Sequence, residues 1–337
     1  MMDEEAERWL AIQANLGRAR NTILAYRHAL IDYFGFCTRF EIAPKIAGRE
    51  QISRYVRSMT DRHEPQSQSA PPSTIPGLAN ATIRQRLTAV RLYYDHLVEE
   101  GMRKDNPVGR GRYTAGSGFY GARSRALVPT YVSLPWIPDP DEWGRLLEVA
   151  ASTSPRDRFM LALAYDAGLR RGELCSLTTG DLDPAHRLVH VRAETTKGRR
   201  ARVVPYSVPT GILFEAYLHH RRDLTRERGP LFISRSRRNH GAPITVWTWS
   251  KTVQALARRS SLHRLGTHTF RHLCLTDLAR AGWELHEIAE FAGHRNTSTT
   301  LLYIHLSGRD LSAKLVRATC AHGLRMVEIG ETLGGAS

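Results

Sequence analysis

Cysteine, lysine and long apolar runs are all scarce in this 337-residue chain, and each scarcity argues against a class of protein. The four cysteines are widely scattered, with no C-x-x-C pair and no histidine pair at zinc-ligand spacing; they are Cys37, Cys175, Cys274 and Cys320. They predict reduced, buried thiols and not a disulfide framework or a zinc site. No apolar run approaches the roughly 18–20 residues that span a bilayer. The acidic N-terminus lacks a signal-peptide core, so we expect an intracellular protein with no membrane partner.

The positive charge of the chain is high and comes almost entirely from arginine. Lysine and arginine together number 48 against 33 aspartates and glutamates, which gives a formal net charge of +15. This predicts attraction to a polyanion, with nucleic acid as the leading candidate, although a basic protein that merely stays soluble has the same composition. Because only five lysines occur, a lysine in a loop stands out as a candidate for a chemical task.

Length and hydrophobic patterning predict two domains joined by a linker. Residues 1–110 are expected to form a helical domain, in which Asn21 and Thr22 cap one helix and Asn80 caps another that ends at Gly101. The outer face of this last helix carries three candidate DNA-binding arginines, Arg84, Arg86 and Arg91. Residues 111–135, rich in glycine, arginine, serine and proline, are interpreted as a basic linker.

Residues 136–337 are expected to form a mainly helical domain with a small strand insertion. Two short alternating segments, Leu188–Arg192 and Arg202–Tyr206, flank a basic stretch and predict a β-hairpin with a basic tip. Helices are expected at about 139–150, 154–168, 208–225, 245–258, 268–281, 284–292, 297–306 and 310–327.

Five short sequence boxes follow one another in this second domain. They are Gly168-Leu169-Arg170 with Glu173-Leu174, Thr196-Lys197-Gly198-Arg199, His268-Thr269-Phe270-Arg271-His272, Gly293-His294, and Tyr303 nine residues after that histidine. The i, i+3 spacing puts His268 and Arg271 on one helix face, where both side chains can converge on one ligand. A single box of this kind arises readily by chance, but five in this order and spacing form a strong signal.

In this order and spacing the boxes resemble those of the tyrosine recombinases, the phage integrase family. The resemblance covers about residue 136 to the end, and residues 1–110 are similar to the family's core-binding domain in size, order and helix pattern. It implies that Arg170 and Arg271 clamp a DNA phosphate and that Glu173 supports Arg170. Ala167 and Ala292 stand where threonine and leucine are commoner in the family, but neither departure removes a catalytic group.

The resemblance implies catalytic roles for four further residues, Lys197, His268, His294 and Tyr303. A tyrosine phenol is a nucleophile that can leave again, but its pKa of about 10 calls for a base or a positive field. His268 suits proton transfer with Tyr303, Lys197 suits protonation of the departing 5′-oxygen, and His294 would hydrogen-bond the phosphate. The product would be a 3′-phosphotyrosyl link and a free 5′-hydroxyl. Because the bond energy is conserved, we expect no ATP, cofactor or metal.

Neighbours of these groups have more ordinary interpretations. Arg171, Arg199 and Arg200 are candidate contacts to the DNA backbone, although a run of charge is usually just solvated. His272 is expected to pack behind the site or to support the assigned groups.

The resemblance implies a two-domain, C-shaped clamp around double-stranded DNA. Four protomers would act on two duplexes, with the last helix docking on a neighbour, from a monomer or weak oligomer without DNA; an accessory protein could take part. We expect a cytoplasmic, nucleoid-associated recombinase that integrates, excises or transposes a mobile element. The alternatives are chromosome-dimer resolution, a type IB topoisomerase with the same chemistry, and a catalytically idle DNA-binding relative.

Overall fold

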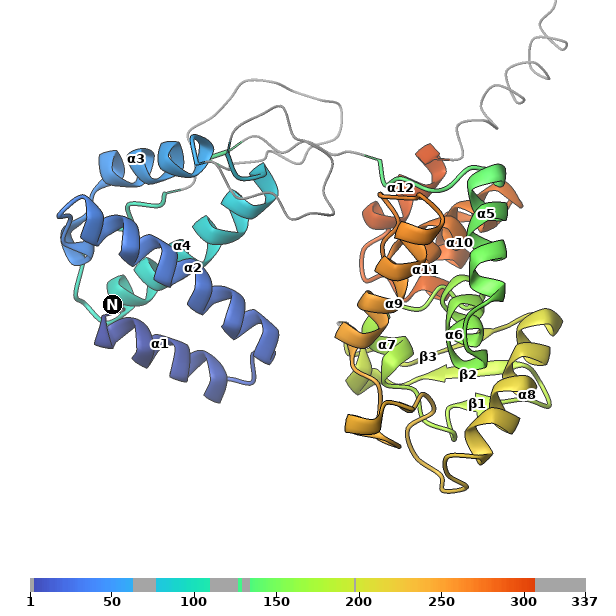
Figure 1. Cartoon of the computed structure of the whole chain (residues 1–337). Coiled ribbons are helices and arrows are strands. Elements are labelled where there is room, and N and C mark those ends of the chain that lie inside the picture. The colour runs from blue at the N-terminus through green and yellow to red at the C-terminus, as the bar shows by residue number, and fades with distance from the viewer. Residues whose placement is uncertain (1–2, 63–76, 110–126, 129–133, 197, 307–337) are drawn as a thin grey trace, which may run out of the picture. The chain divides into compact units, whose positions relative to one another are not determined.

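The computed structural model describes residues 3–62, 77–109, 127–128, 134–196 and 198–306 (Figure 1). The chain forms two compact units, Met1–Ser133 and Leu134–Ser337. The division falls at the C-terminal end of the segment interpreted as a linker, most of which lies outside the described residues. Each unit is described by itself.

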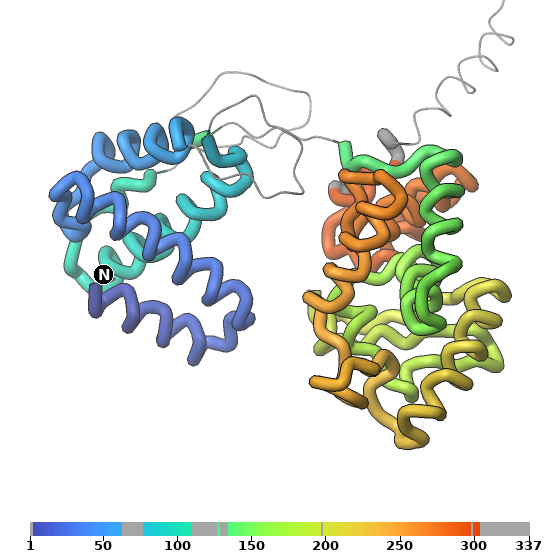
Figure 2. The backbone as a smooth tube through the Cα atoms, in the orientation of Figure 1, coloured from blue at the N-terminus to red at the C-terminus, as the bar shows by residue number. Residues whose placement is uncertain are grey.

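The first unit is helical (Figure 2). Its elements are α1 (Glu4–Asn15), α2 (Arg20–Arg39), the 3-10 turn η1 (Pro44–Ile46), α3 (Arg49–Thr60) and α4 (Asn80–Glu99). The core between these helices is rich in aromatic residues, and Tyr33, Tyr55, Tyr93 and Tyr94 are fully buried. The Tyr33 and Tyr94 hydroxyls lie 2.6 Å apart, so these buried polar atoms satisfy each other.

The helix starts predicted for this unit are wrong in detail. Helix α2 begins at Arg20 with Ala19 as its N-cap, and α4 begins at Asn80 with Ala79 as its N-cap; neither cap makes a side-chain hydrogen bond. Asn21, Thr22 and Asn80 therefore lie inside the helices, where a side chain cannot act as the N-cap acceptor. The predicted end of α4 is confirmed, because Gly101 follows it with φ +70°.

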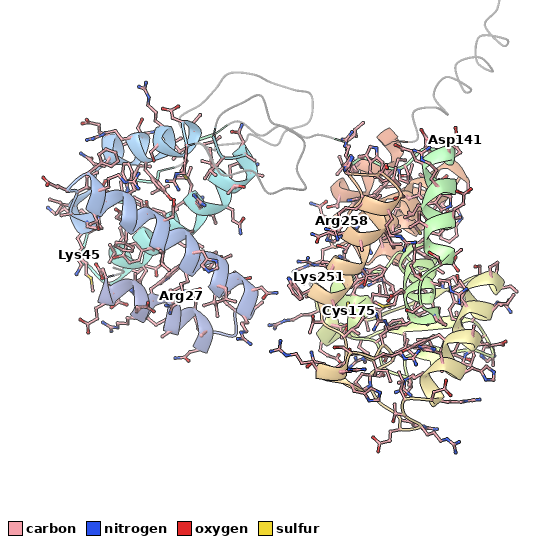
Figure 3. The ribbon with its side chains drawn as sticks, viewed as in Figure 1. Arg27, Lys45, Asp141, Cys175, Lys251 and Arg258 are labelled. Carbon is pink, nitrogen blue, oxygen red and sulfur yellow. The ribbon has the colours of Figure 1, made fainter. Side chains whose placement is uncertain are left out.

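The second unit is also mainly helical, with one small sheet. Its helices are α5 (Pro140–Ala151), α6 (Pro155–Asp166), α7 (Arg171–Cys175), α8 (Val208–Arg222), α9 (Val246–Arg259), α10 (Thr269–Arg280), α11 (Leu285–Ala292) and α12 (Ser298–Leu306). Short 3-10 turns lie at η2 (Ala193–Thr195) and η3 (Arg237–Asn239). Charged side chains such as Lys251 and Arg258 project from α9 (Figure 3). The predicted fold class, mainly α with a small hairpin, is confirmed.

The sheet is antiparallel, with strand order β1 (Leu182–Asp183), β2 (Leu188–Val191) and β3 (Arg202–Pro205). Strands β2 and β3 form the predicted hairpin, in the register Val189↔Val204 and Val191↔Arg202. Valines of β2 and β3 are buried in the core of the unit, so the ends of the loop between these strands are held in place. The two-residue strand β1 and the five-residue helix α7 were not predicted, since neither is long enough to show a period.

Three of the four cysteines, Cys37, Cys175 and Cys274, are free and buried, as expected. Cys320 and the amphipathic segment predicted at 310–327 lie outside the described residues. Among the residues that are described, no helix is both long and apolar enough to cross a bilayer.

Candidate active site

Arg271 lies at the centre of a cluster of basic side chains in the second unit. Its side chain projects from the first turn of α10, and the residue is 3% exposed. The guanidinium donates to the backbone carbonyls of Gly168 and Ala292, both at 2.6 Å. Gly168 has φ +55°, and a Cβ there would meet the Phe291 ring at 3.1 Å, so glycine is required where the chain turns from α6 toward α7. These contacts fix the guanidinium in one orientation.

Arg170 approaches the same point from the N-terminus of α7. Its side chain is 24% exposed and donates to the carbonyls of Ala292 at 3.3 Å and Gly293 at 3.4 Å. The two predicted clamp arginines therefore converge on the C-terminal end of α11. Burial and the charge of Arg170 lower the pKa of Arg271 to about 10, which leaves Arg271 charged at neutral pH.

Glu173 is the counter-ion of this cluster and is 1% exposed. It accepts from the Arg170 backbone N–H at 3.0 Å and from Arg170 Nη1 at 2.9 Å, so it contacts the arginine that the resemblance implies it supports. Arg202 of β3 adds a bidentate pair at 2.8 and 3.2 Å. Burial alone would raise the pKa of Glu173, but hydrogen bonds and charge from Arg202, together with hydrogen bonds from Arg170, lower it to about 2.

His294 follows Gly293, which ends α11 in the left-handed conformation at φ +63°. Its Nε2 lies 2.9 Å from Arg271 Nη2, and its Nδ1 lies 2.9 Å from Thr300 Oγ1. Because a guanidinium can only donate, Nε2 is the acceptor and Nδ1 carries the proton. Burial and the nearby Arg271 and Arg170 lower the pKa of His294 to about 4, so the ring is neutral at pH 7.

Tyr303 lies on α12 and is 3% exposed, with its ring stacked on that of His294 at 6.1 Å between centroids and 9° between planes. Its hydroxyl lies 3.1 Å from Nδ1 of His272. Burial lowers the pKa of His272 to about 4, so this ring is neutral at pH 7 and its Nδ1 can accept the phenolic proton. Burial raises the pKa of Tyr303, while the charges of Arg271 and Arg170 lower it.

His268 caps α10 and remains exposed at the edge of the cluster. Desolvation by the surrounding protein and the charges of Arg171 and Arg271 lower its pKa. The Tyr303 hydroxyl forms its hydrogen bond with His272 and not with His268, whose ring centroid lies 6.3 Å from that of His272. The i, i+4 spacing of the two histidines was the available signal, because it places both on the helix face that carries the site.

Lys197 lies outside the described residues, but the base of its loop is fixed. The Thr196 hydroxyl donates to the Ala193 carbonyl at 2.9 Å and accepts from the Arg200 N–H at 3.0 Å. A Cβ on Gly198 would lie 3.5 Å from the Arg295 side chain, so the loop passes beside the residue that follows His294.

The candidate DNA-binding arginines have varied surroundings. Arg171, Arg199 and Arg200 are exposed. Arg84, Arg86 and Arg91 on α4 are half-buried. Nη1 of Arg86 lies 3.0 Å from Asp32 Oδ2 without hydrogen-bond geometry, so this charge is ion-paired.

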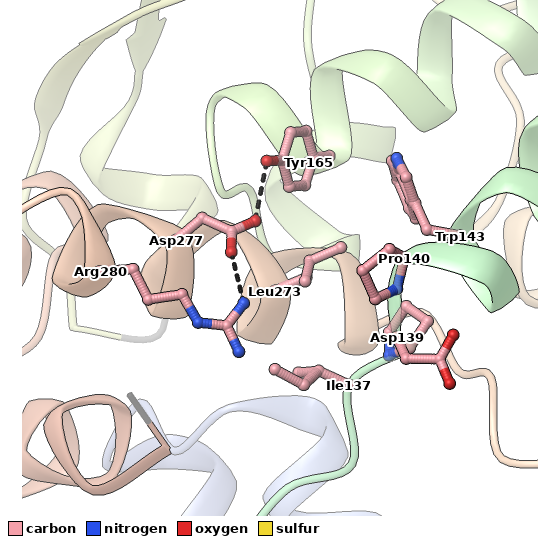
Figure 4. A pocket seen from close by; sticks show the side chains of 9 residues that line it. Ile137, Asp139, Pro140, Trp143, Tyr165, Leu273, Asp277 and Arg280 are labelled. Carbon is pink, nitrogen blue, oxygen red and sulfur yellow. Dashed lines mark hydrogen bonds and ion pairs between the residues drawn. The ribbon is translucent and has the colours of Figure 1, made fainter. Parts of the chain in front are cut away.

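The cavity drawn in Figure 4 is separate from this cluster. It measures about 440 Å³ and lies between the start of α5 and one face of α10 (Figure 4). Asp277 bridges Tyr165 and Arg280 at its wall, each at 2.9 Å. None of the predicted catalytic residues lines it.

Comparisons with known proteins place the chain in a family. Residues 138–309 match the model of the phage integrase family. The tyrosine recombinase XerC of Thermodesulfovibrio yellowstonii is 27% identical over 310 residues, which cover 89% of this chain and 90% of the relative. XerC of Mycobacterium leprae is 29% identical over 243 residues, 68% of this chain and 74% of the relative.

Two solved structures share the fold. A XerH site-specific recombinase bound to a palindromic difH substrate has a TM-score of 0.64 at 18% identity, over 87% of this chain and 78% of that one. The Tn1549 transposon integrase in complex with circular intermediate DNA also has a TM-score of 0.64, at 17% identity over 90% of this chain and 95% of that one. The family match over more than half of the chain shows that the chain belongs to the phage integrase family and is a tyrosine recombinase, an enzyme that transfers DNA strands in site-specific recombination.

Proposed function

We propose that Tyr303 is the nucleophile of site-specific DNA recombination and that Arg170 and Arg271 clamp the phosphate it attacks. The observation that carries this proposal is the contact of the Tyr303 hydroxyl with a neutral histidine, beside the buried Arg271 and the partly exposed Arg170. Such a field stabilises both the phenolate and the charge that builds on phosphorus in the transition state.

The reaction proceeds by exchange of one phosphodiester for another. The Tyr303 oxygen forms a bond to phosphorus while the bond from phosphorus to the 5′-oxygen breaks. The phenolic proton passes to Nδ1 of His272, which lies 3.1 Å from the hydroxyl. Lys197 protonates the departing 5′-oxygen. The free 5′-hydroxyl of a second strand then attacks the phosphotyrosine and releases Tyr303.

Because Tyr303 is 3% exposed, its hydroxyl reaches a DNA phosphate only after α12 shifts or the cluster opens. The hydrogen bonds of the site favour a shift of α12 over a rearrangement of the clamp arginines. The clamp arginines are held by several bonds to backbone carbonyls and to Glu173, whereas the Tyr303 hydroxyl contacts side chains, with Nδ1 of His272 at 3.1 Å.

Covalent capture of DNA tests the chemistry. Fragmented genomic DNA of the source organism is incubated with wild-type protein or with Tyr303→Phe, and DNA that stays bound in detergent is recovered and sequenced. We expect capture at a defined site by the wild type, and loss of capture with retained DNA binding in Tyr303→Phe. Capture by the variant would identify another nucleophile.

The captured sequence also tests the biological role, which we propose to be integration, excision or transposition of a mobile element by a cytoplasmic assembly of four protomers on two duplexes. Cleavage sites that flank the element carrying the gene support this role. A single chromosomal site far from the gene supports chromosome-dimer resolution instead. Cleavage without a site, together with relaxation of supercoiled plasmid and no recombinants, supports the topoisomerase alternative.

A further inference from the structure

Arg202 is a buried arginine of the active-site cluster with no assigned role in the chemistry. Its side chain is 7% exposed although it lies on β3, the outer strand of the hairpin. It donates to both carboxylate oxygens of Glu173 at 2.8 and 3.2 Å, and its Nε donates to the carbonyl of Phe291 at 2.9 Å. A buried guanidinium with this many fixed bonds orients whatever it touches.

The contacts of Arg202 join three segments that each present a catalytic group. Its own strand pairs with β2 at Val191 and forms the base of the loop that carries Lys197. Glu173 connects it to Arg170. The Phe291 carbonyl connects it to the end of α11, directly before the turn that presents His294.

The turn at Gly293 is shaped to receive this guanidinium. A Cβ on Gly293 would lie 3.1 Å from Arg202 Nη1 and 3.2 Å from its Cδ, so the absent side chain leaves the space that Arg202 occupies. The left-handed φ of +63° and the close approach thus both favour glycine at this position.

Arg202 also determines how Arg170 is shared between Glu173 and the substrate. Glu173 would be held by Arg170 alone without Arg202, and a buried carboxylate with one partner would draw that partner fully onto itself. In the structure Arg202 supplies the bidentate pair, and the Arg170 side chain gives Glu173 one bond, through Nη1. Other donors of the Arg170 fork stay available for a phosphate.

We propose that Arg202 is a positioning residue for strand cleavage. It holds the Arg170–Glu173 pair, the turn before His294 and the base of the Lys197 loop in one arrangement, and it does not contact DNA itself. This inference rests on the proposed function. Lysine cannot replace it, because an ammonium lacks the planar fork and the Nε donor that make the three contacts simultaneously.

The test uses two variants, Arg202→Lys and Arg202→Gln, and one matched control, Arg192→Gln. Arg192 directly follows β2, at the same end of the hairpin as Arg202, and also bonds a buried carboxylate, Asp181, at 3.1 Å, but it does not contact Glu173. Single-turnover formation of the tyrosyl adduct, DNA affinity and melting temperature are measured for each. The substrate is a synthetic duplex that carries the site mapped with wild-type protein.

We expect Arg202→Lys to slow adduct formation on the order of 10²-fold, as displacements near 1 Å do, with DNA affinity little changed. The control should cleave at close to the wild-type rate. Wild-type cleavage by both Arg202 variants overturns the proposal, as does an equal loss in the control. If Arg202→Gln does not fold, Arg202→Lys decides alone, since it keeps the charge. Absence of any adduct from the wild type contradicts the proposed function instead.

A second substrate identifies the route by which Arg202 acts. Sulfur in place of the bridging 5′-oxygen gives a leaving group that needs no protonation, so it should restore cleavage by Lys197→Ala. We expect no such rescue of Arg202→Lys, because its direct contacts lead to Arg170 and His294. Full rescue would show that only the Lys197 loop depends on Arg202 and would overturn the proposed link to the clamp. The double variant Glu173→Gln/Arg202→Gln should slow adduct formation little more than Glu173→Gln alone does.

Discussion

Each unit of the chain holds one carboxylate between two arginines and a third donor, and the two centres differ in burial. In the first unit Asp32 accepts from Arg62 and, at 2.6 Å, from the Tyr55 hydroxyl, and it pairs with Arg86; its side chain is 20% exposed. In the second unit Glu173 is 1% exposed and also accepts from a backbone N–H. Water can reach Asp32 but not Glu173, so the first centre is a partly exposed network and the second a buried one.

The largest difference is expected in cleavage rate. Arg271→Ala removes the guanidinium that contacts two backbone carbonyls and His294, and it should slow adduct formation on the order of 10²-fold or more. Arg62→Ala in the partly exposed network of the first unit should leave the chemical step unchanged in DNA-saturated protein. Single-turnover assays compare the two, and near-wild-type cleavage by Arg271→Ala would refute the clamp assignment.

A smaller difference is expected in stability. Glu173→Gln leaves the buried guanidinium of Arg202 and the partly exposed one of Arg170 without their counter-ion, and it should lower the free energy of unfolding of the second unit by about 3–5 kcal/mol. Asp32→Asn should lower that of the first unit by about 1 kcal/mol or less, because its partners can turn to water. Urea unfolding of each variant measures both values. Equal losses would show that burial is not what distinguishes the two centres.

The last expected effect is on the pH dependence of stability. His272 and His294 have pKa values lowered to about 4 in the folded chain, against about 6.5 when unfolded. As the pH falls from 6.5 to 4, the unfolded chain binds protons that the folded chain does not, so stability falls by at most about 1.4 kcal/mol per pH unit for each histidine. Glu173 adds a further loss as the pH falls from 4.5 toward 2. Replacing His272 with alanine should reduce the slope between pH 6.5 and 4, and an unchanged slope would contradict its assignment as a buried neutral ring.

Much of the second unit was predictable because its signals are local. The pairs Asp139-Pro140 and Ser154-Pro155 mark the starts of α5 and α6, and the observed helices begin there. Gly293 marks the end of α11 in the same way. The sequence boxes likewise singled out Arg170, Arg271, His294 and Tyr303, which the fold gathers into one cluster.

What the sequence did not show depends on contacts between distant residues. Arg202 and Glu173 are 29 positions apart, and no motif links them. Asp32 on α2 pairs with Arg86 on α4. The position of Arg86 on the outer face of its own helix predicted a contact to DNA and could not show this ion pair. His272, and not the predicted His268, contacts the Tyr303 hydroxyl because of the direction in which α12 packs on α10. The spacing of residues along one helix cannot give that direction.

The most direct test of the central claim is to identify the residue joined to DNA. Wild-type protein is trapped on a nicked duplex that carries its mapped site, digested with trypsin and nuclease, and examined by mass spectrometry. The account predicts a single phosphonucleotide-modified peptide, with the modification on Tyr303. A modification on any other tyrosine, or on a serine or histidine, would contradict it.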